Sequence, residues 1–446
     1  MTQEEALKLL KLGSNVFITG AAGTGKTYVL NKYVDYLRKH NIAVAITAST
    51  GIAATHMNGI TIHSWSGIHL DQKITGETWA RIRRINGLEE GIRIAKVLIV
   101  DEVSMLHHYR LDMVDQVCRR IRQNQAPFGG LQVIMSGDFF QLPPVQGEGE
   151  PEAKFVVNSQ VWNNMDLKIC YLMKQYRQDD KQFLQILSEM RDGQVHENSK
   201  LLLNSRLNKP VDLDIEIKVT QLYTTNRSVD AINTYELNQI DGEEVQYLMA
   251  SRGVRDLVTK LKKGCMAPED LRLKVDAVVM FVRNNFGRGY VNGTLGRVIG
   301  FDKDSGYPII ETIHKREVIA TPESWAIEQQ GAVIAEISQV PLRLAWAITV
   351  HKSQGMSLDA AIIDLSKAFV EGMGYVALSR VRRLDGIKLL GINDMALRVH
   401  PESIMLDRNL QEQSRAVKEA LNKLGSWRLT RGQKRTLRLM KSKNTS

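Results

Sequence analysis

Short apolar runs alternate with helical patterns through residues 15–136. The runs NVFIT, IAVAIT, KVLIVD and LQVIMS are continuous and rich in branched side chains, which is typical of buried parallel strands. Between the first two runs, TYVLNKYVDYLRKH places Val29, Leu30, Tyr33 and Val34 on one helical face. This alternation predicts a parallel sheet covered by helices.

A second set of apolar runs follows later in the chain: KVTQLYTTN, AWAITVHK, AAIIDLS and IKLLG. Residues 241–340 interrupt this set with short strand-like runs such as VDAVVMFV and LGRVIGF, separated by turns such as NNFGRGYVNGT. Short strands bounded by Gly and Asn turns predict a small antiparallel barrel, here inserted into a second α/β domain. From residue 399 the pattern is helical, and it ends in WRLTRGQKRTLRLMKSKNTS, which contains no acidic residue.

The composition narrows the class of protein. A chain of 446 residues is too long for one core, so we expect several domains. The three cysteines lie far apart with no CxxC pair, which argues against a disulfide scaffold or zinc site and favours an intracellular setting. No signal-like start or membrane-length apolar run occurs, so no membrane partner is expected. The formal net charge of +10 favours a polyanionic partner.

The motif GAAGTGKT follows the first predicted strand and opens the first long helix. That context makes it a P-loop, whose glycines let backbone N–H groups surround phosphate at a helix N-terminus. Lys26 is predicted to reach the β- and γ-phosphates of ATP, and the Thr27 hydroxyl to ligate Mg²⁺. The predicted phosphate-binding residues are Gly20, Ala21, Ala22, Gly23, Thr24, Gly25, Lys26 and Thr27.

The apolar run KVLIV ends in two adjacent carboxylates. Asp101 at the strand tip suits a ligand of Mg²⁺, and Glu102 suits the general base that activates water. In a nucleotide kinase the attacking group would be a substrate hydroxyl, so the pair favours hydrolysis of ATP.

The stretch GDFFQLPPV follows the strand LQVIMS. Pro143 and Pro144 forbid regular structure, so the chain should leave the sheet as a stiff loop that holds Gln141 out. Beside the carboxylate strand, Gln141 would sense the γ-phosphate or the attacking water. Phe139 and Phe140 are equally consistent with core packing and with base stacking.

Eight motifs occur in a fixed order along the chain: GAAGTGKT, TASTGIAA, TIHSWSGI, DEVSM, GDFFQLPPV, QYRQ, ITVHKSQGMSLD and YVALSR. This set resembles the motifs of superfamily 1B helicases. The residues within the motifs are most similar to those of the petite-integration-frequency (Pif) family, relatives of RecD and Dda. RLDMVDQVCRRIRQNQAPFGGLQVI resembles the signature stretch of that family, and YVNGTLGRVIG resembles its inserted barrel. The resemblance spans about residues 1–395.

The resemblance implies an α/β fold with two RecA-like parallel-sheet P-loop motor domains, ATP between them and single-stranded DNA across the top. It also implies a small wedge subdomain inserted in the first domain and an SH3-like β-barrel in the second. The expected boundaries are 1–205 for the first domain with its wedge at about 65–92, 206–240 and 341–398 for the second, 241–340 for the barrel, and 399–446 for a helical basic segment.

Further site residues follow from the resemblance alone. Gln3 corresponds to a glutamine that reads adenine, which suits an amide because it both donates and accepts. Arg177 and Arg380 correspond to arginines that reach the γ-phosphate, and Gln354 and Gly355 correspond to residues lining the nucleotide cleft.

The resemblance also implies contacts with DNA from both motor domains. The residues concerned are Thr50, Gly51, His63, Ser64 and Pro143 in the first domain, and Thr224, Asn226, His351, Lys352 and Ser353 in the second. Their types suit phosphate contact rather than base reading, so sequence-independent binding is expected. Trp65 is consistent with a DNA contact or with packing. The basic C-terminal segment is consistent with DNA binding or with a solvated tail.

These features together predict an ATP- and Mg²⁺-dependent DNA helicase that moves 5′→3′ on single strands and opens tailed or forked duplexes. The expected motor is a monomer, with an oligomer on DNA as the alternative. Activity on G-quadruplexes or RNA–DNA hybrids, in genome maintenance or replication, is a further expectation. A translocase of opposite polarity or RNA preference remains an alternative. From a different class, a binding module whose P-loop merely switches DNA affinity is also open, although Glu102, Gln141, Arg177 and Arg380 together argue against it.

Overall fold

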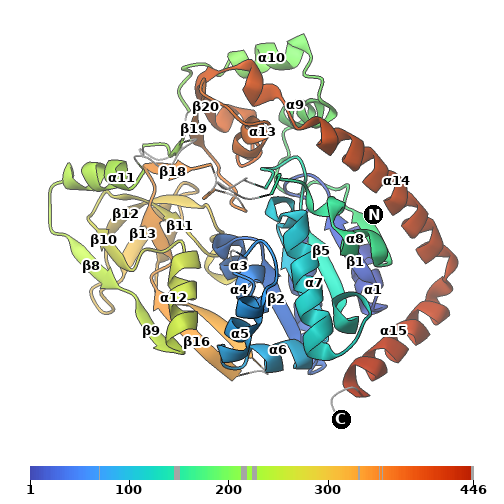
Figure 1. The fold of residues 1–446 in the computed structure, drawn as a ribbon. Coiled ribbons are helices and arrows are strands. Elements are labelled where there is room, and N and C mark those ends of the chain that lie inside the picture. The colour runs from blue at the N-terminus through green and yellow to red at the C-terminus, as the bar shows by residue number, and fades with distance from the viewer. Residues whose placement is uncertain are drawn as a thin grey trace. The chain divides into compact units, whose positions relative to one another are not determined.

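A computed structural model describes residues 1–69, 71–144, 151–211, 218–223, 229–329, 332–350, 352–353 and 355–442 (Figure 1). The chain forms two compact units. The first unit contains Met1–Tyr176, Ile327–Val333 and Met405–Ser446, and the second contains Arg177–Ala326 and Ile334–Ile404. Residues 177–205 thus group with the second unit, and most of the C-terminal segment groups with the first. The expected domain boundaries stay a prediction.

The first unit is built on a six-stranded sheet in the order β3-β2-β4-β5-β1-β6, in which all neighbouring strands are parallel. The strands are β1 (Asn15–Thr19), β2 (Val44–Ala48), β3 (Ile60–Thr61), β4 (Val97–Asp101), β5 (Gln132–Ser136) and β6 (Leu167–Tyr171). The predicted carboxylate strand β4 thus pairs with β5, and β5 also pairs with the P-loop strand β1. The pairing of β4 with β5 confirms that the GDFFQLPPV stretch begins beside the carboxylate strand.

Both faces of this sheet are buried. Successive residues of a strand point to opposite faces, and Phe17 belongs to one apolar cluster while Val16 and Ile18 belong to the other. The helices of the first unit before residue 176 are α1 (Gln3–Lys11), α2 (Lys26–Lys39), α3 (Gly51–His56), α4 (Ile62–Ser66), α5 (Gly76–Arg84), α6 (Leu88–Ile94), α7 (His108–Arg122) and α8 (Gln160–Asn164). Because both faces of each strand are covered, the strands are apolar at consecutive positions rather than at alternate ones.

The segment expected to form a wedge, residues 65–92, contains α5 and most of α6. Ile82 and Ile92 are fully buried in the same apolar cluster as Phe17, and Trp65 packs against that cluster. The sequence was consistent with a DNA contact or with a packing role for Trp65, and its position against this cluster supports packing. A wedge that separates strands stays a prediction.

The second unit contains a four-stranded parallel sheet in the order β18-β7-β19-β20. Its strands are β7 (Gln221–Tyr223), β18 (Ala347–Thr349), β19 (Ala361–Leu365) and β20 (Ile387–Ile392). The helices of this unit are α9 (Lys181–Asp192), α10 (Glu197–Asn204), α11 (Val229–Asn238), α12 (Arg255–Gly264) and α13 (Met373–Leu378). All four strands coincide with the second set of apolar runs.

The interruption between residues 241 and 340 is antiparallel, as its turn-rich sequence predicts. Its strands are β8 (Val245–Leu248), β9 (Ala250–Gly253), β10 (Asp270–Leu273), β11 (Val278–Phe281), β12 (Leu295–Phe301), β13 (Pro308–Thr312), β14 (Glu317–Ile319), β15 (Glu323–Gln329) and β16 (Ala332–Gln339), followed by β17 (Leu342–Leu344). They form sheets in the orders β10-β8, β14-β13-β12-β11-β17 and β15-β16-β9. A closed SH3-like barrel stays a prediction.

Two long helices end the chain, α14 (Pro401–Lys423) and α15 (Gly425–Ser442). Leu421 is buried in one apolar cluster with residues of α1, and Leu429, Leu437 and Met440 pack against that cluster. Figure 1 shows α15 beside α1, as their contacts require. Among the described residues, no helix combines the length and the apolar character needed to cross a membrane.

Candidate active site

The P-loop joins β1 to α2 at the edge of the first sheet. Lys26 is the first residue of α2, and its Nζ donates hydrogen bonds to the carbonyl oxygens of Gly20 at 2.8 Å and Ala21 at 3.2 Å. These bonds hold the ammonium group over the loop. Thr27 follows in the first turn and is exposed, so its hydroxyl is accessible to a ligand.

Gly25 shows why this loop needs glycine. Its φ is +82°, in the left-handed region, and a Cβ there would lie 2.2 Å from the Nε2 atom of Gln3. A side chain here would be strained in the left-handed region and would push the Gln3 amide out of its present position, so glycine suits this turn of the loop. The Nε2 of Gln3 donates to the carbonyl oxygen of Thr24 at 3.0 Å.

Asp101 is the last residue of β4, which pairs with β5, and β5 also pairs with the P-loop strand β1. Its Oδ1 accepts a hydrogen bond from the hydroxyl of Ser136 at 2.6 Å and one from the backbone N–H of Glu102 at 2.9 Å. Burial raises the pKa of this carboxyl, while the two hydrogen bonds and the charge of Lys26 oppose that rise. The Asp101 carboxylate and the exposed Thr27 hydroxyl supply oxygen donors, the ligand type that Mg²⁺ prefers.

Glu102 has a strained backbone, with φ of +54° in a residue that is not glycine. Its carbonyl accepts a hydrogen bond from the Ser49 hydroxyl at 2.7 Å, and the Ser49 N–H donates to the carbonyl of Asp101 at 3.1 Å. The end of β2 thereby fixes the turn after β4. Such strain costs on the order of 1–3 kcal/mol and occurs most often at functional sites.

The GDFFQLPPV loop leaves β5 between the P-loop strand and the carboxylate strand. Its tight turn is closed by bonds to Asp138, whose carbonyl accepts from the Gln141 N–H at 3.0 Å. Gln141 is only 5% exposed, so it is held in the loop rather than projecting from it as the sequence suggested. Phe139 and Phe140 are buried, and the Phe139 ring lies 5.5 Å from that of Phe17, which supports core packing.

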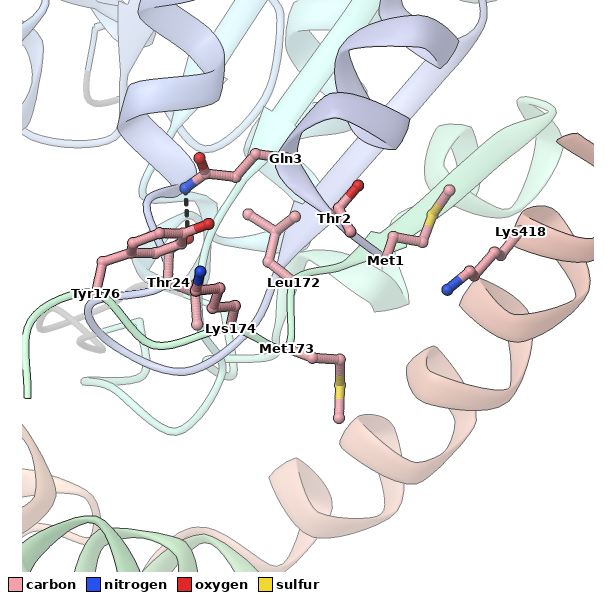
Figure 2. A pocket seen from close by; sticks show the side chains of 9 residues that line it. All are labelled: Met1, Thr2, Gln3, Thr24, Leu172, Met173, Lys174, Tyr176 and Lys418. Atoms are coloured by element: carbon pink, nitrogen blue, oxygen red, sulfur yellow. Dashed lines mark hydrogen bonds between the residues drawn. The ribbon is translucent and has the colours of Figure 1, made fainter. Parts of the chain in front are cut away.

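A pocket opens between α1 and the P-loop, and all of its lining belongs to the first unit. Its lining residues are Met1, Thr2, Gln3, Thr24, Leu172, Met173, Lys174, Tyr176 and Lys418. Figure 2 shows the Tyr176 ring near Gln3 and Thr24 at one end, and Lys418 of α14 near Met1 at the other. The Tyr176 side chain is 56% exposed, and its N–H donates to the carbonyl of Gly23 at 3.0 Å. An amide beside an exposed aromatic ring suits a purine base.

The two predicted arginines of the second unit converge on Ser379. Arg177 donates to the Ser379 carbonyl at 3.1 Å, and Arg380 donates to the Ser379 hydroxyl at 3.3 Å and to the Val376 carbonyl at 3.0 Å. Arg380 is 1% exposed, and its guanidinium is held by the end of α13. The contact of both arginines with the γ-phosphate stays a prediction.

The predicted DNA contacts of the first unit occupy the ends of two short helices. The Thr50 hydroxyl caps α3, and Ser64 in α4 bonds to the hydroxyl of Thr61 at 2.9 Å. Gly51 is the first residue of α3, and His63 lies in α4. Pro143 is half-buried in the loop after β5.

The corresponding residues of the second unit are only partly described. Thr224, Asn226, His351 and Gln354 lie outside the described residues. Lys352 is half-buried, and Gly355 has a positive φ of 80°. Ser353 is fully buried and its hydroxyl donates to the carbonyl of Val350 at 2.7 Å, so it supports the loop rather than presenting a hydroxyl at the surface.

Three residues of the site were not predicted from the sequence. Ser136 bonds the Asp101 carboxylate, Tyr176 lines the pocket, and Gln178 donates to the carbonyls of Ser379 at 3.0 Å and Val381 at 3.2 Å. Ser136 directly precedes the motif GDFFQLPPV, and Tyr176 and Gln178 lie in the motif QYRQ. Their position relative to a motif was the only sign in the sequence that they belong to the site.

Two family models match the chain: PIF1-like helicase over residues 2–201, and DNA helicase Pif1, 2B domain, over residues 256–301. An ATP-dependent DNA helicase Pif1 from Psychrobacter is 42% identical over 94% of this chain and 72% of the relative. The human ATP-dependent DNA helicase PIF1 is 35% identical, over 90% of this chain and 62% of the relative. This chain belongs to the Pif1-like family of ATP-dependent DNA helicases.

Solved Pif1 structures agree with this assignment. Pif1 from a Bacteroides species in complex with ADP-AlF4 is 29% identical, covers 92% of this chain and 96% of its own, and has a TM-score of 0.79. Pif1 from Candida albicans is 35% identical, with coverage of 92% and 98% and a TM-score of 0.71. The α/β architecture with two RecA-like domains predicted from the motifs is confirmed by these neighbours.

Proposed function

We propose that this Pif1-like chain couples hydrolysis of MgATP to 5′→3′ movement on single-stranded DNA, and thereby opens tailed or forked duplexes. One observation carries the proposal. The P-loop, the Asp101–Glu102 pair and the Gln141 loop follow the adjacent parallel strands β1, β4 and β5. The carboxyl ends of parallel strands meet at one edge of a sheet, where α/β folds bind ligands.

The base of ATP is assigned to the pocket between α1 and the P-loop. There the Gln3 amide can pair with adenine and the Tyr176 ring can stack on it. Lys26 bonds the β- and γ-phosphates in place of the carbonyls that now hold its ammonium group. Thr27 and Asp101 would hold Mg²⁺, which neutralises charge on the transferred phosphoryl group.

Hydrolysis uses the remaining groups of the same sheet edge. Glu102 takes a proton from the water that attacks the γ-phosphorus, so the bond to the β-phosphate oxygen breaks and ADP leaves with inorganic phosphate. Gln141 bonds the γ-phosphate or that water, and it loses the bond when phosphate departs. Arg177 and Arg380 are proposed to stabilise the charge that develops on the γ-phosphate.

The DNA partner is supported by the structural neighbours. A Bacteroides Pif1 with a TM-score of 0.60 to this chain is 29% identical and is bound to single-stranded DNA. We assign the phosphate contacts of this chain to Thr50, Gly51, His63, Ser64 and Pro143, together with Thr224, Asn226, His351 and Lys352. These types contact phosphate and sugar rather than base edges, so binding should not depend on sequence and should weaken with salt.

The direct test is strand separation of two duplexes that differ only in the polarity of their single-stranded tail, with ATP and Mg²⁺. Unwinding from the 5′-tailed duplex alone is the expected result. Unwinding from the 3′ tail alone would leave the motor intact and reverse the direction. ATP hydrolysis that DNA does not stimulate would instead favour a nucleotide-switched binding module.

Replacing Gln141 with alanine should reduce DNA-stimulated ATP turnover more than basal turnover. The reason is that Gln141 stands on the loop between the P-loop strand and the carboxylate strand, where it can respond to the γ-phosphate. Steady-state hydrolysis with and without single-stranded DNA measures both rates, and Gln146→Ala, at the residue that follows GDFFQLPPV in the sequence, is the control variant. An equal loss of both rates would show that Gln141 has no coupling role.

A further inference from the structure

Helix α15 carries six basic residues and no acidic one. The basic residues are Arg428, Arg431, Lys434, Arg435, Arg438 and Lys441. All six are exposed. We call their combined surface the α15 basic face.

The basic residues and the packed residues lie on opposite sides of this helix. At 100° per residue, the six basic positions fall within a sector of about 140°. Positions 429, 433, 436, 437 and 440 fall in the opposite sector, and these are the residues that fasten the helix to the first unit. Gln433 donates to the Lys8 carbonyl at 3.3 Å and the Thr436 hydroxyl to the Leu12 carbonyl at 2.8 Å. Leu429, Leu437 and Met440 pack on the cluster that includes α1. The structure therefore fixes which side of α15 faces solvent.

Acidic side chains of the described residues leave the charges of the α15 basic face unpaired. Within the described part of the chain, none of the six side chains forms an ion pair. The Arg431 guanidinium lies 5.2 Å from the ring centroid of Trp427, which is 67% exposed and falls in the same sector. This contact orders one cation at the surface, because a ring face attracts a guanidinium.

Helix α14 gives a comparison within the same molecule. It carries both acidic and basic side chains, as an ordinary solvated helix does, and Lys418 pairs with Glu5 of α1 at 3.7 Å. The absence of acids on α15 is therefore a property of that helix rather than of the whole C-terminal segment. An ordinary solvated face would mix both signs.

The shape and charge of the α15 basic face indicate which kind of polyanion it can bind. Basic helices that lie on membranes insert an apolar face, but the apolar face of α15 is already packed on the first unit. A single strand is bound in a charged groove with stacking rings, whereas the α15 basic face is the convex side of a helix. From Arg428 to Lys441 the face is about 20 Å long, and duplex DNA presents one phosphate charge per about 1.7 Å.

We propose that the α15 basic face binds the phosphate backbone of duplex DNA, outside the motor's single-strand contacts. This rests on the proposed function in taking DNA as the polyanion. The face would hold the double-stranded part of a substrate while the motor engages the tail. The binding should be independent of sequence, because the face offers charge and no set of groups for base edges.

The test compares the full chain with the triple variant Arg431→Gln, Arg435→Gln and Arg438→Gln. A blunt 20-base-pair duplex is titrated by fluorescence anisotropy across a range of salt concentrations. Removing three phosphate contacts should weaken duplex binding roughly 10- to 100-fold near 0.1 M salt, and should lower the salt slope by about 2–3. ATP hydrolysis stimulated by a short oligothymidylate should be unchanged.

The control variant Arg408→Gln, Arg415→Gln and Lys423→Gln removes the same charge from exposed positions of α14. Equal weakening by both triple variants would show a net-charge effect and overturn the proposal, as would unchanged duplex binding in the α15 variant. Loss of oligothymidylate binding to the same extent would reassign the face to single strands, and α15-dependent binding of phosphatidylserine vesicles in place of duplex would reassign it to membranes. If the unaltered chain shows no DNA-stimulated hydrolysis, the proposed function fails while the duplex measurement still reports on α15.

Discussion

Replacing Arg380 with alanine should lower the kcat of DNA-stimulated ATP hydrolysis by roughly 10³-fold or more, the effect of removing an arginine finger. The guanidinium is a planar, permanently charged fork that suits phosphate oxygens. In the structure it is buried and donates to Val376 and to Ser379, the residue that Arg177 also contacts. Arg380→Lys should recover little of the rate, since an ammonium cannot reproduce the fork. Steady-state hydrolysis at saturating ATP measures the loss.

A buried arginine can also matter for stability alone, so a matched control is needed. Arg206 in the same unit is 7% exposed and donates to the backbone carbonyls of Ile387 at 2.7 Å and Asp385 at 2.9 Å. Arg206→Ala removes comparable internal bonds, and both variants should show a similar loss of thermal stability. Comparable losses of kcat in the two variants would place Arg380 among the structural residues and remove it from the chemistry.

Replacing Glu102 with glutamine should lower kcat by roughly 10²–10⁴-fold while ATP binding is retained, because the amide keeps the shape but cannot take a proton. The fixed turn supports this role: the Ser49 hydroxyl holds the Glu102 carbonyl, and the neighbouring Asp101 is locked by Ser136. Turnover is measured as above, and nucleotide affinity is measured by titration with a fluorescent ATP analogue. The control Glu412→Gln makes the same change at an exposed position of α14 and should leave both values unaltered. Near-normal turnover in Glu102→Gln would exclude it as the base.

The parts of the site that follow one another closely in sequence were predictable. The P-loop, the carboxylate pair and the GDFF stretch each follow an apolar run, and parallel strands bring such ends to one edge. The sheet order β4-β5-β1 confirms this. The antiparallel pairing within residues 241–340 could also be predicted from the sequence, because turn residues and short apolar runs are local signals.

Contacts between distant positions were not predictable in the same way. The bonds of Arg380 to Val376 and Ser379 depend on where α13 ends, and the burial of Gln141 depends on how its loop packs. Whether the C-terminal segment was a free tail could not be decided from its charge, because its apolar positions are meaningful only once α1 supplies a surface. A single sequence records the side chains but not which distant partner each one meets.

The packing of α14 and α15 on α1 has a consequence for how the chain acquires its fold during synthesis. Helix α1 emerges from the ribosome first, but the cluster that it joins includes Leu421, which is made more than 400 residues later. Domains generally fold as units in the order of their synthesis, but this unit is discontinuous. Residues of α2 and of the sheet cover most of the apolar side of α1, but the part of α1 that packs against α15 stays exposed while the whole second unit is being made. Nascent chains should therefore depend on chaperones for an unusually long interval, and a slower C-terminal translation rate should lengthen it.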